Sequence, residues 1–234
     1  MNTREIGRFE GVHLEEVYRT SREAITRLIA DTDAERRRRI VPACPDWTVH
    51  DLVSHVTGIA VDLGAGRPPS GNPQSWVDRQ VDERRDRTTA DVIAEWEAAC
   101  VDFEPMISAT PNAFWGLVYD LVVHEFDLRN ALGDRSGRNL ERVAVAAELG
   151  LRLVKGDLRK AGLGAVVVDM AGDRIRVGDG DVGLTLRVDS FECLRMLGSR
   201  RTRDELSAAD VDGDLSHYVD ALVHMDLPVQ SLGE

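Results

Sequence analysis

The sequence predicts an α+β protein in which a four-helix bundle over residues 8–135 precedes a small α+β domain over residues 140–234. Apolar residues recur at helical spacing through the first part. Short β-branched segments separated by Gly-Asp turns occur in the second part. Between the two parts, "GDRSG" at 133–137 has the composition of a boundary. A chain of 234 residues is long enough for two small domains.

The first two helices of the bundle are predicted from their apolar stripes and from one capping signal. Residues 12–31 place Leu14, Val17 and Ile25 on one helical face. Pro42 and Pro45 then interrupt the chain. Thr48 follows as a helix cap, with Asp51 in the third position of a capping box, and the second helix runs on to Leu63.

The other two helices of the bundle follow a predicted loop. Residues 64–76 are rich in Gly, Pro and Ser, which indicates a loop. A third helix is predicted over 89–107, beginning at Thr88 or Thr89. The fourth contains "YDLVVHEFDLRNAL" at 119–132 and should stop near Gly133. Four amphipathic helices with modest connections are typical of a bundle.

The pattern of the second part combines helices with strands. A helix is predicted over 139–160. Three short segments, "GAVVVDM", "DRIRVG" and "VGLTLRVD", are predicted to be strands of a meander. "SFECLRMLGS" and "LSHYVDALVHM" then return to helical spacing.

Composition excludes several classes of partner. The net charge of −12 argues against nucleic acid or an anionic membrane, because both require a positive surface. We interpret the basic run at 35–39 as a solvated helix end.

No apolar run approaches the roughly 20 residues that span a bilayer, and the first residues lack the apolar core of a signal peptide. Three widely spaced cysteines do not form a disulfide framework. We therefore expect a cytoplasmic protein with reduced thiols.

Three ionisable residues fall on the inward faces of two predicted helices. His55 lies on the apolar stripe of the second helix, and Asp120 and His124 are one turn apart in the fourth. Two histidines and one carboxylate match a catalytic zinc site, which keeps a fourth position open. The alternative is that Asp120 and His124 form a surface pair and His55 is a hydrogen-bonded core histidine.

Three segments carry a resemblance to a known family. "VPACPDWTVHDLVSHVTGI" and "VYDLVVHEFDLRNAL" resemble the mycothiol-dependent maleylpyruvate isomerase family, and "LRVDSFECLRMLGSRRTRDEL" is similar to its C-terminal domain. The resemblance implies a DinB-like four-helix bundle followed by a small sterol-carrier-like α+β domain. It also implies a divalent metal, usually zinc, held by His, Glu and His. These positions correspond to His55, Asp120 and His124, so a shorter carboxylate replaces the Glu.

The resemblance further implies the kind of reaction. Mycothiol would be the thiol cosubstrate, activated by the metal to add to an electrophilic small molecule. A maleylpyruvate-type cis–trans isomerisation is the expected reaction. The alternatives are a mycothiol S-transferase that detoxifies electrophiles and, because of Asp120, a non-catalytic DinB-like protein that has lost the metal. The expected partner is a small-molecule substrate, such as an anionic unsaturated acid, and neither nucleic acid nor membrane.

Further residues are candidates for supporting roles. Asp127, three residues after His124, is either an acceptor that orients a ligand or a helix-surface partner of Arg129. An anionic substrate would require arginine, and the candidates are Arg84, Arg85, Arg200 and Arg201, with Arg85 and Arg201 preferred as catalytic residues. We interpret Cys44 as a small buried residue.

Overall fold

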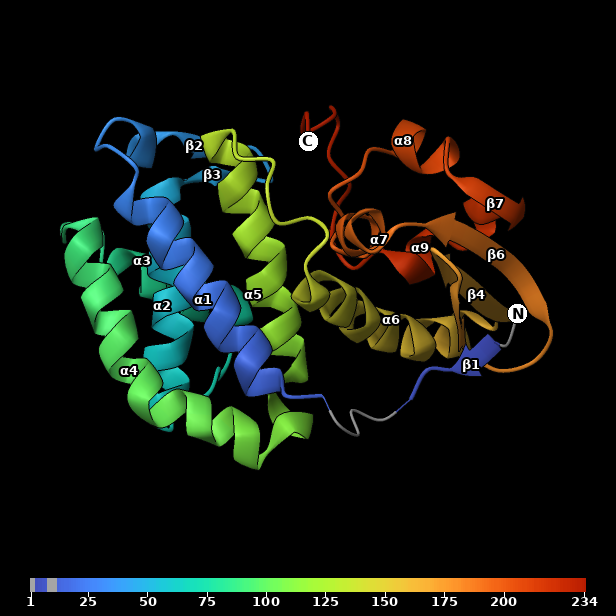
Figure 1. The fold of residues 1–234 in the computed structure, drawn as a ribbon, viewed down its shortest axis with the longest axis horizontal. Helices are drawn as coiled ribbons and strands as arrows, with labels where there is room; N and C mark the ends of the chain where they lie inside the picture. The colour runs from blue at the N-terminus through green and yellow to red at the C-terminus, as the bar shows by residue number, and fades with distance from the viewer. Residues whose placement is uncertain (1–2, 8–11) are drawn as a thin grey trace. The chain divides into compact units, whose positions relative to one another are not determined.

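A computed structural model describes residues 3–7 and 12–234 and divides the chain into two units (Figure 1). One unit, residues 13–134, is helical. The other contains residues 135–234 and the described part of residues 1–12. The predicted α+β class is confirmed, since a helical N-terminal unit is followed by a mixed sheet with helices. Residues 8–11, at the start of the predicted bundle, lie outside the described residues.

The helical unit contains a bundle of four long helices. Helix α1 packs against α4 and α5, and α2 packs against α4. A short hairpin of β2 and β3 precedes α2. The elements of the unit are α1 (Leu14–Ala30), a 3₁₀ turn (Arg36–Arg38), β2 (Ile40–Val41), β3 (Cys44–Thr48), α2 (Val49–Gly64), α3 (Pro73–Asp82), α4 (Thr89–Ala109) and α5 (Pro111–Leu132).

Both helices that carry the predicted ligands have well-defined ends. The Thr48 hydroxyl accepts from the amide of Asp51, and the Asp51 carboxylate accepts from the amide of Thr48 at 2.9 Å, so the predicted capping box at the start of α2 is confirmed. Gly133 ends α5 in the left-handed conformation with φ of 74°, which glycine adopts without steric cost.

Helix α3 was not predicted, because its first residues look like part of a loop. Asn72 caps it and Pro73 occupies its first turn. Along its length only Gln80 and Val81 are buried, so no apolar stripe reveals it in the sequence. The predicted loop over 64–76 is therefore wrong at its C-terminal end. Helix α3 packs against α2.

The second unit is built on a five-stranded sheet with the order β1-β5-β4-β6-β7. Strands β4 and β5 are antiparallel, but β6 runs parallel to β4 on its other side. The predicted meander is therefore wrong, because the chain crosses β4 between β5 and β6. The elements are β1 (Thr3–Glu5), α6 (Glu141–Ala161), β4 (Ala165–Met170), β5 (Asp173–Val177), β6 (Val182–Val188), α7 (Ser190–Leu197), α8 (Arg203–Ser207), β7 (Asp210–Gly213), a 3₁₀ turn (Leu215–His217) and α9 (Val219–Leu222).

The N-terminal strand belongs to the second unit although it precedes the helical unit in the sequence. Strand β1 pairs in parallel with β5. Arg4 on this strand donates to Glu148 of α6 and to Asp173 of β5. Among the described helices, none combines the length and apolar character that a membrane crossing requires.

The capping box at the start of α2 makes a measurable contribution to stability. We expect Thr48→Ala to lower the free energy of unfolding by about 1 kcal/mol, because one helix amide loses its acceptor. All four tryptophans lie in the helical unit, so urea unfolding followed by tryptophan fluorescence reports on that unit. Thr48→Ser, which keeps the hydroxyl, is the control. An alanine variant as stable as the wild type would contradict this expectation.

Candidate metal centre

The structure brings His55, Asp120 and His124 together between α2 and α5. One potential ligand atom from each lies within 4.8 Å of the others. The imidazole rings are nearly perpendicular, with 5.5 Å between their centroids. His124 Nε2 is 3.5 Å from Asp120 Oδ1. The three side chains therefore form a cluster, whereas metal binding by them stays a prediction.

The cluster is buried on its histidine side and open on its carboxylate side. His55 and His124 are 5% and 7% exposed. The Asp120 side chain is 44% exposed. A cavity of about 10 Å³ adjoins it, lined by Tyr18, Val56, Ile59, Leu117, Asp120 and Leu121, and its volume is that of roughly one water molecule. Solvent therefore reaches the cluster on the side of Asp120.

A hydrogen bond to a buried acceptor orients each histidine. His124 Nδ1 donates to Asp127 Oδ2 at 3.0 Å, and His55 Nδ1 contacts Gln80 Oε1 at 3.0 Å. Bonds of this kind fix the ring and leave Nε2 for a metal. Asp127 is fully buried, so the alternative of a helix-surface role for it is wrong. Its position fits an acceptor that orients His124.

The environment affects the two histidines in opposite ways. Burial lowers the pKa of His55 to about 4, and the charge of His124 adds to the effect. Burial alone would also lower the pKa of His124, but Asp120, Asp127 and Cys44 raise it to about 10. At neutral pH the metal-free cluster thus holds His124 as a positively charged imidazolium beside two acidic side chains. These surroundings favour a cation.

The donor set fits a divalent metal. Two imidazole nitrogens and one carboxylate oxygen are the usual protein ligands of a catalytic zinc, which keeps its fourth position open. Asp120, although shorter than Glu, remains within reach of the His124 nitrogen. The fit rests on the three converging donors together with the acceptor behind each imidazole.

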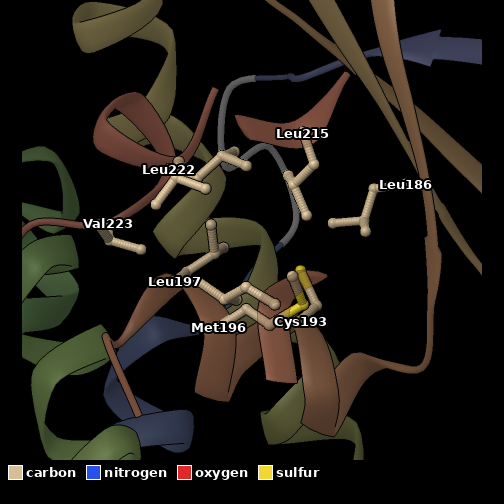
Figure 2. Close-up of a pocket in the computed structure, with 9 residues that line it drawn as sticks. Leu186, Cys193, Met196, Leu197, Leu215, Leu222 and Val223 are labelled. Atoms are coloured by element: carbon tan, nitrogen blue, oxygen red, sulfur yellow. The ribbon is translucent and has the colours of Figure 1, made fainter. Parts of the chain in front are cut away.

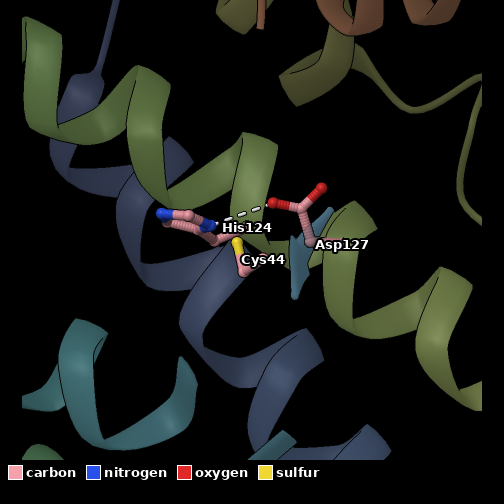
Figure 3. Close-up of side chains that lie close together, drawn as sticks. All are labelled: Cys44, His124 and Asp127. Atoms are coloured by element: carbon pink, nitrogen blue, oxygen red, sulfur yellow. Dashed lines mark hydrogen bonds and ion pairs between the residues drawn. The ribbon is translucent and has the colours of Figure 1, made fainter. Parts of the chain in front are cut away.

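Sequence analysis missed the position of Cys44. Figure 3 shows its sulfur beside the His124 nitrogen that faces Asp127, and the three residues form a second group of potential metal ligands. Cys44 is half-buried, so the expectation of a buried residue is wrong. The hairpin of β2 and β3 places it there, and no periodicity in the sequence reveals this contact. His124 belongs to both groups of potential ligands. Its Nδ1 already donates a hydrogen bond to Asp127.

The two preferred arginines lie in different units. Arg85 is an exposed side chain that donates to Asp82. Arg201 is buried in the second unit, where its guanidinium donates to Glu192 at 2.8 Å and to Glu234 at 2.6 Å. Both therefore have carboxylate partners within their own unit. Their catalytic roles stay predictions.

A further cavity lies in the second unit and is apolar (Figure 2). Its volume is about 10 Å³, and Leu186, Cys193, Met196, Leu197, Leu206, Leu215, Val219, Leu222 and Val223 line it. Burial raises the pKa of the Cys193 thiol to about 12. The thiol is therefore protonated at neutral pH and is not a nucleophile there. We interpret this cavity as a packing space of the core.

The fold and the cluster define a class of two-unit α+β proteins in which a helical bundle gathers two histidines and a carboxylate. Residues 18–129 match the family model of the mycothiol maleylpyruvate isomerase N-terminal domain. The helical unit therefore carries the N-terminal domain of that family. None of the curated proteins compared with the chain matches it.

Two solved structures resemble the chain over most of its length. Both are of the mycothiol-dependent maleylpyruvate isomerase, one of them a histidine-to-alanine mutant. The mutant matches with a TM-score of 0.55 at 13% identity, and the other structure matches with a TM-score of 0.52 at 14% identity. Each match covers 84% of this chain and 91% of the solved chain. At such identities the likeness shows a common fold.

The opposite shifts of the two histidines predict how the stability of the metal-free protein depends on pH. The raised pKa of His124 contributes stability below the unfolded value of 6.5, and this contribution is lost as the pH rises toward about 10. The lowered pKa of His55 costs stability as the pH falls from 6.5 toward about 4. We therefore expect the stability that wild type gains over His124→Gln to shrink between pH 6.5 and 10.

The measurement is urea unfolding of chelator-treated protein at several pH values, followed by tryptophan fluorescence. His55→Gln is the matched variant, and its difference from wild type should change on the acidic side instead. A constant difference between wild type and His124→Gln from pH 6.5 to 10 would show that the His124 proton is not held as described.

Proposed function

We propose that the chain is a metal-dependent enzyme that uses mycothiol to isomerise a small unsaturated acid. The convergence of His55, Asp120 and His124, with an acceptor behind each imidazole, is the observation that carries this proposal. The family domain over residues 18–129 supports it, as do the solved structures named for a mycothiol-dependent maleylpyruvate isomerase.

The chain's own residues prepare the site. His55 and His124 supply nitrogen ligands from α2 and α5, and Asp120 supplies an oxygen at the exposed side of the cluster. Asp127 fixes the His124 ring and increases its basicity. A bound zinc ion would lower the pKa of a thiol, which makes the thiol a nucleophile at neutral pH.

The proposed reaction conserves all atoms. The thiolate adds to the cis double bond of an unsaturated acid, and the bond between the former alkene carbons becomes single and rotates. Elimination of the same thiolate restores the double bond in the trans form. A transferase would begin with the same activated sulfur and release the thioether instead, so the ligand set supports either reaction.

The metal content of the purified protein tests the first part of the proposal. We expect stoichiometric zinc by elemental analysis, and we expect His55→Ala and His124→Ala to lose it, because each removes a ligand from a three-residue set. His217→Ala is a suitable control, since His217 is an exposed histidine of the second unit. A wild-type protein that neither contains nor takes up zinc would favour the non-catalytic alternative.

The products formed with mycothiol test the second part. The zinc-loaded protein should convert maleylpyruvate to its trans isomer and return the thiol unchanged, which chromatography and thiol titration can follow. A stable thioether with other electrophiles would identify a transferase. Zinc binding without either product would contradict an enzymatic role with this thiol.

A further inference from the structure

The buried side chain of Gln80 links the metal cluster to a carboxylate outside it. Gln80 lies on α3 and is fully buried. Its Oε1 is 3.0 Å from His55 Nδ1, and its Nε2 donates to Asp62 Oδ2 at 3.3 Å. A single amide thus joins His55 and Asp62, both of which belong to α2.

The chemistry of Asp62 determines which way the Gln80 amide points. Burial alone would raise the pKa of Asp62, but hydrogen bonds from Arg79 and Arg67 lower it below its ordinary value. The Arg79 and Arg67 guanidinium groups lie 2.7 and 3.0 Å from its oxygens. An ionised carboxylate only accepts hydrogen bonds. The NH₂ group of Gln80 must therefore face Asp62, and its oxygen must face His55.

The direction of the amide in turn determines where the His55 proton lies. The Gln80 oxygen is an acceptor only, so His55 Nδ1 must carry the hydrogen. Neutral imidazole has one N–H, and Nε2 of His55 is then left with its lone pair. A metal requires that lone pair.

The packing around Gln80 is specific to its position. A Cβ at Gly58 would lie 2.5 Å from the Gln80 Cβ, so a larger residue at 58 would displace Gln80. Arg84 also donates to the Gln80 backbone oxygen at 2.9 Å. Glycine on α2 and the hydrogen bond from Arg84, which follows the end of α3, thus allow the amide to approach His55 closely.

We propose that Gln80 is a positioning residue that keeps His55 in the tautomer with a bare Nε2, and that Asp62 sets the direction of its amide. The inference rests on the proposed role of His55 as a metal ligand. It also accounts for the residue type. A carboxylate at position 80 would place a second negative charge beside Asp62, whereas an amide satisfies both neighbours.

Metal affinity is the first test. We expect Gln80→Leu to weaken zinc binding roughly 10- to 100-fold, as is typical when the partner of a metal-bound histidine is removed. The measurement is competition with a chromophoric chelator in the whole chain, with circular dichroism as a check of folding. Gln74→Leu is the matched control, because Gln74 is an exposed residue of the same helix. Equal zinc affinity in wild type and folded Gln80→Leu would overturn the proposal.

The tautomer itself is the second test and needs no metal. Nitrogen-15 NMR spectra of the metal-free wild type should show neutral His55 with its proton on Nδ1. The spectra of Gln80→Leu should show a mixture of the two tautomers, with the proton on Nδ1 in one and on Nε2 in the other. Asp62→Asn is a second variant that keeps Gln80 but lets its amide turn over, so it should loosen the same preference. If Gln80→Leu does not fold, Asp62→Asn carries the test.

The two tests separate this inference from the proposed function. A tautomer that depends on Gln80 in a protein without zinc affinity would support the positioning role and contradict the metal-dependent function. Tight zinc binding together with a His55 tautomer that neither variant changes would leave the function standing and overturn the role of Gln80.

Discussion

The burial of two imidazoles inside a helical bundle is the constraint on which the helical unit depends. A buried polar group without a partner costs several kcal/mol, and His55 and His124 each have a partner within 3.0 Å. The partners differ in charge. Asp127 is a carboxylate and favours a positive charge on His124. The partner of His55 is the neutral Gln80, and burial together with the charge of His124 keeps His55 uncharged. The cluster therefore combines one basic and one neutral imidazole beside the open carboxylate of Asp120.

This constraint explains why segments far apart in the sequence must meet. Helices α2 and α5 bring the three potential ligands, but neither supplies the acceptor behind His55. Helix α3 supplies it, although little else on that helix is buried. The hairpin before α2 adds Cys44 beside His124. A helix that buries little apolar surface thus supplies a polar contact to the cluster.

The second unit also buries charge, but in closed networks. Arg195 is fully buried and pairs with Glu234, and Arg201 pairs with both Glu192 and Glu234. Removing one member would leave a buried charge without its partner, which is strongly destabilising. These ion pairs explain why Arg195 and Arg201 are buried without assigning either of them a role in a reaction. The helical unit differs because its partly exposed carboxylate, Asp120, lies beside two histidines.

The sequence by itself determined the α+β class, the capping box at Thr48, the end of α5 at Gly133 and the inward position of His55 and His124. These follow from local periodicity and from capping, which depend on residues a few positions apart. Only the tertiary structure decided that α3 is a helix, that β6 crosses beside β4, and that Gln80 and Cys44 reach the two histidines. Those features depend on contacts between residues distant in sequence. Helix α3 in particular is short and mostly exposed, so its sequence lacks the apolar periodicity from which a helix is predicted.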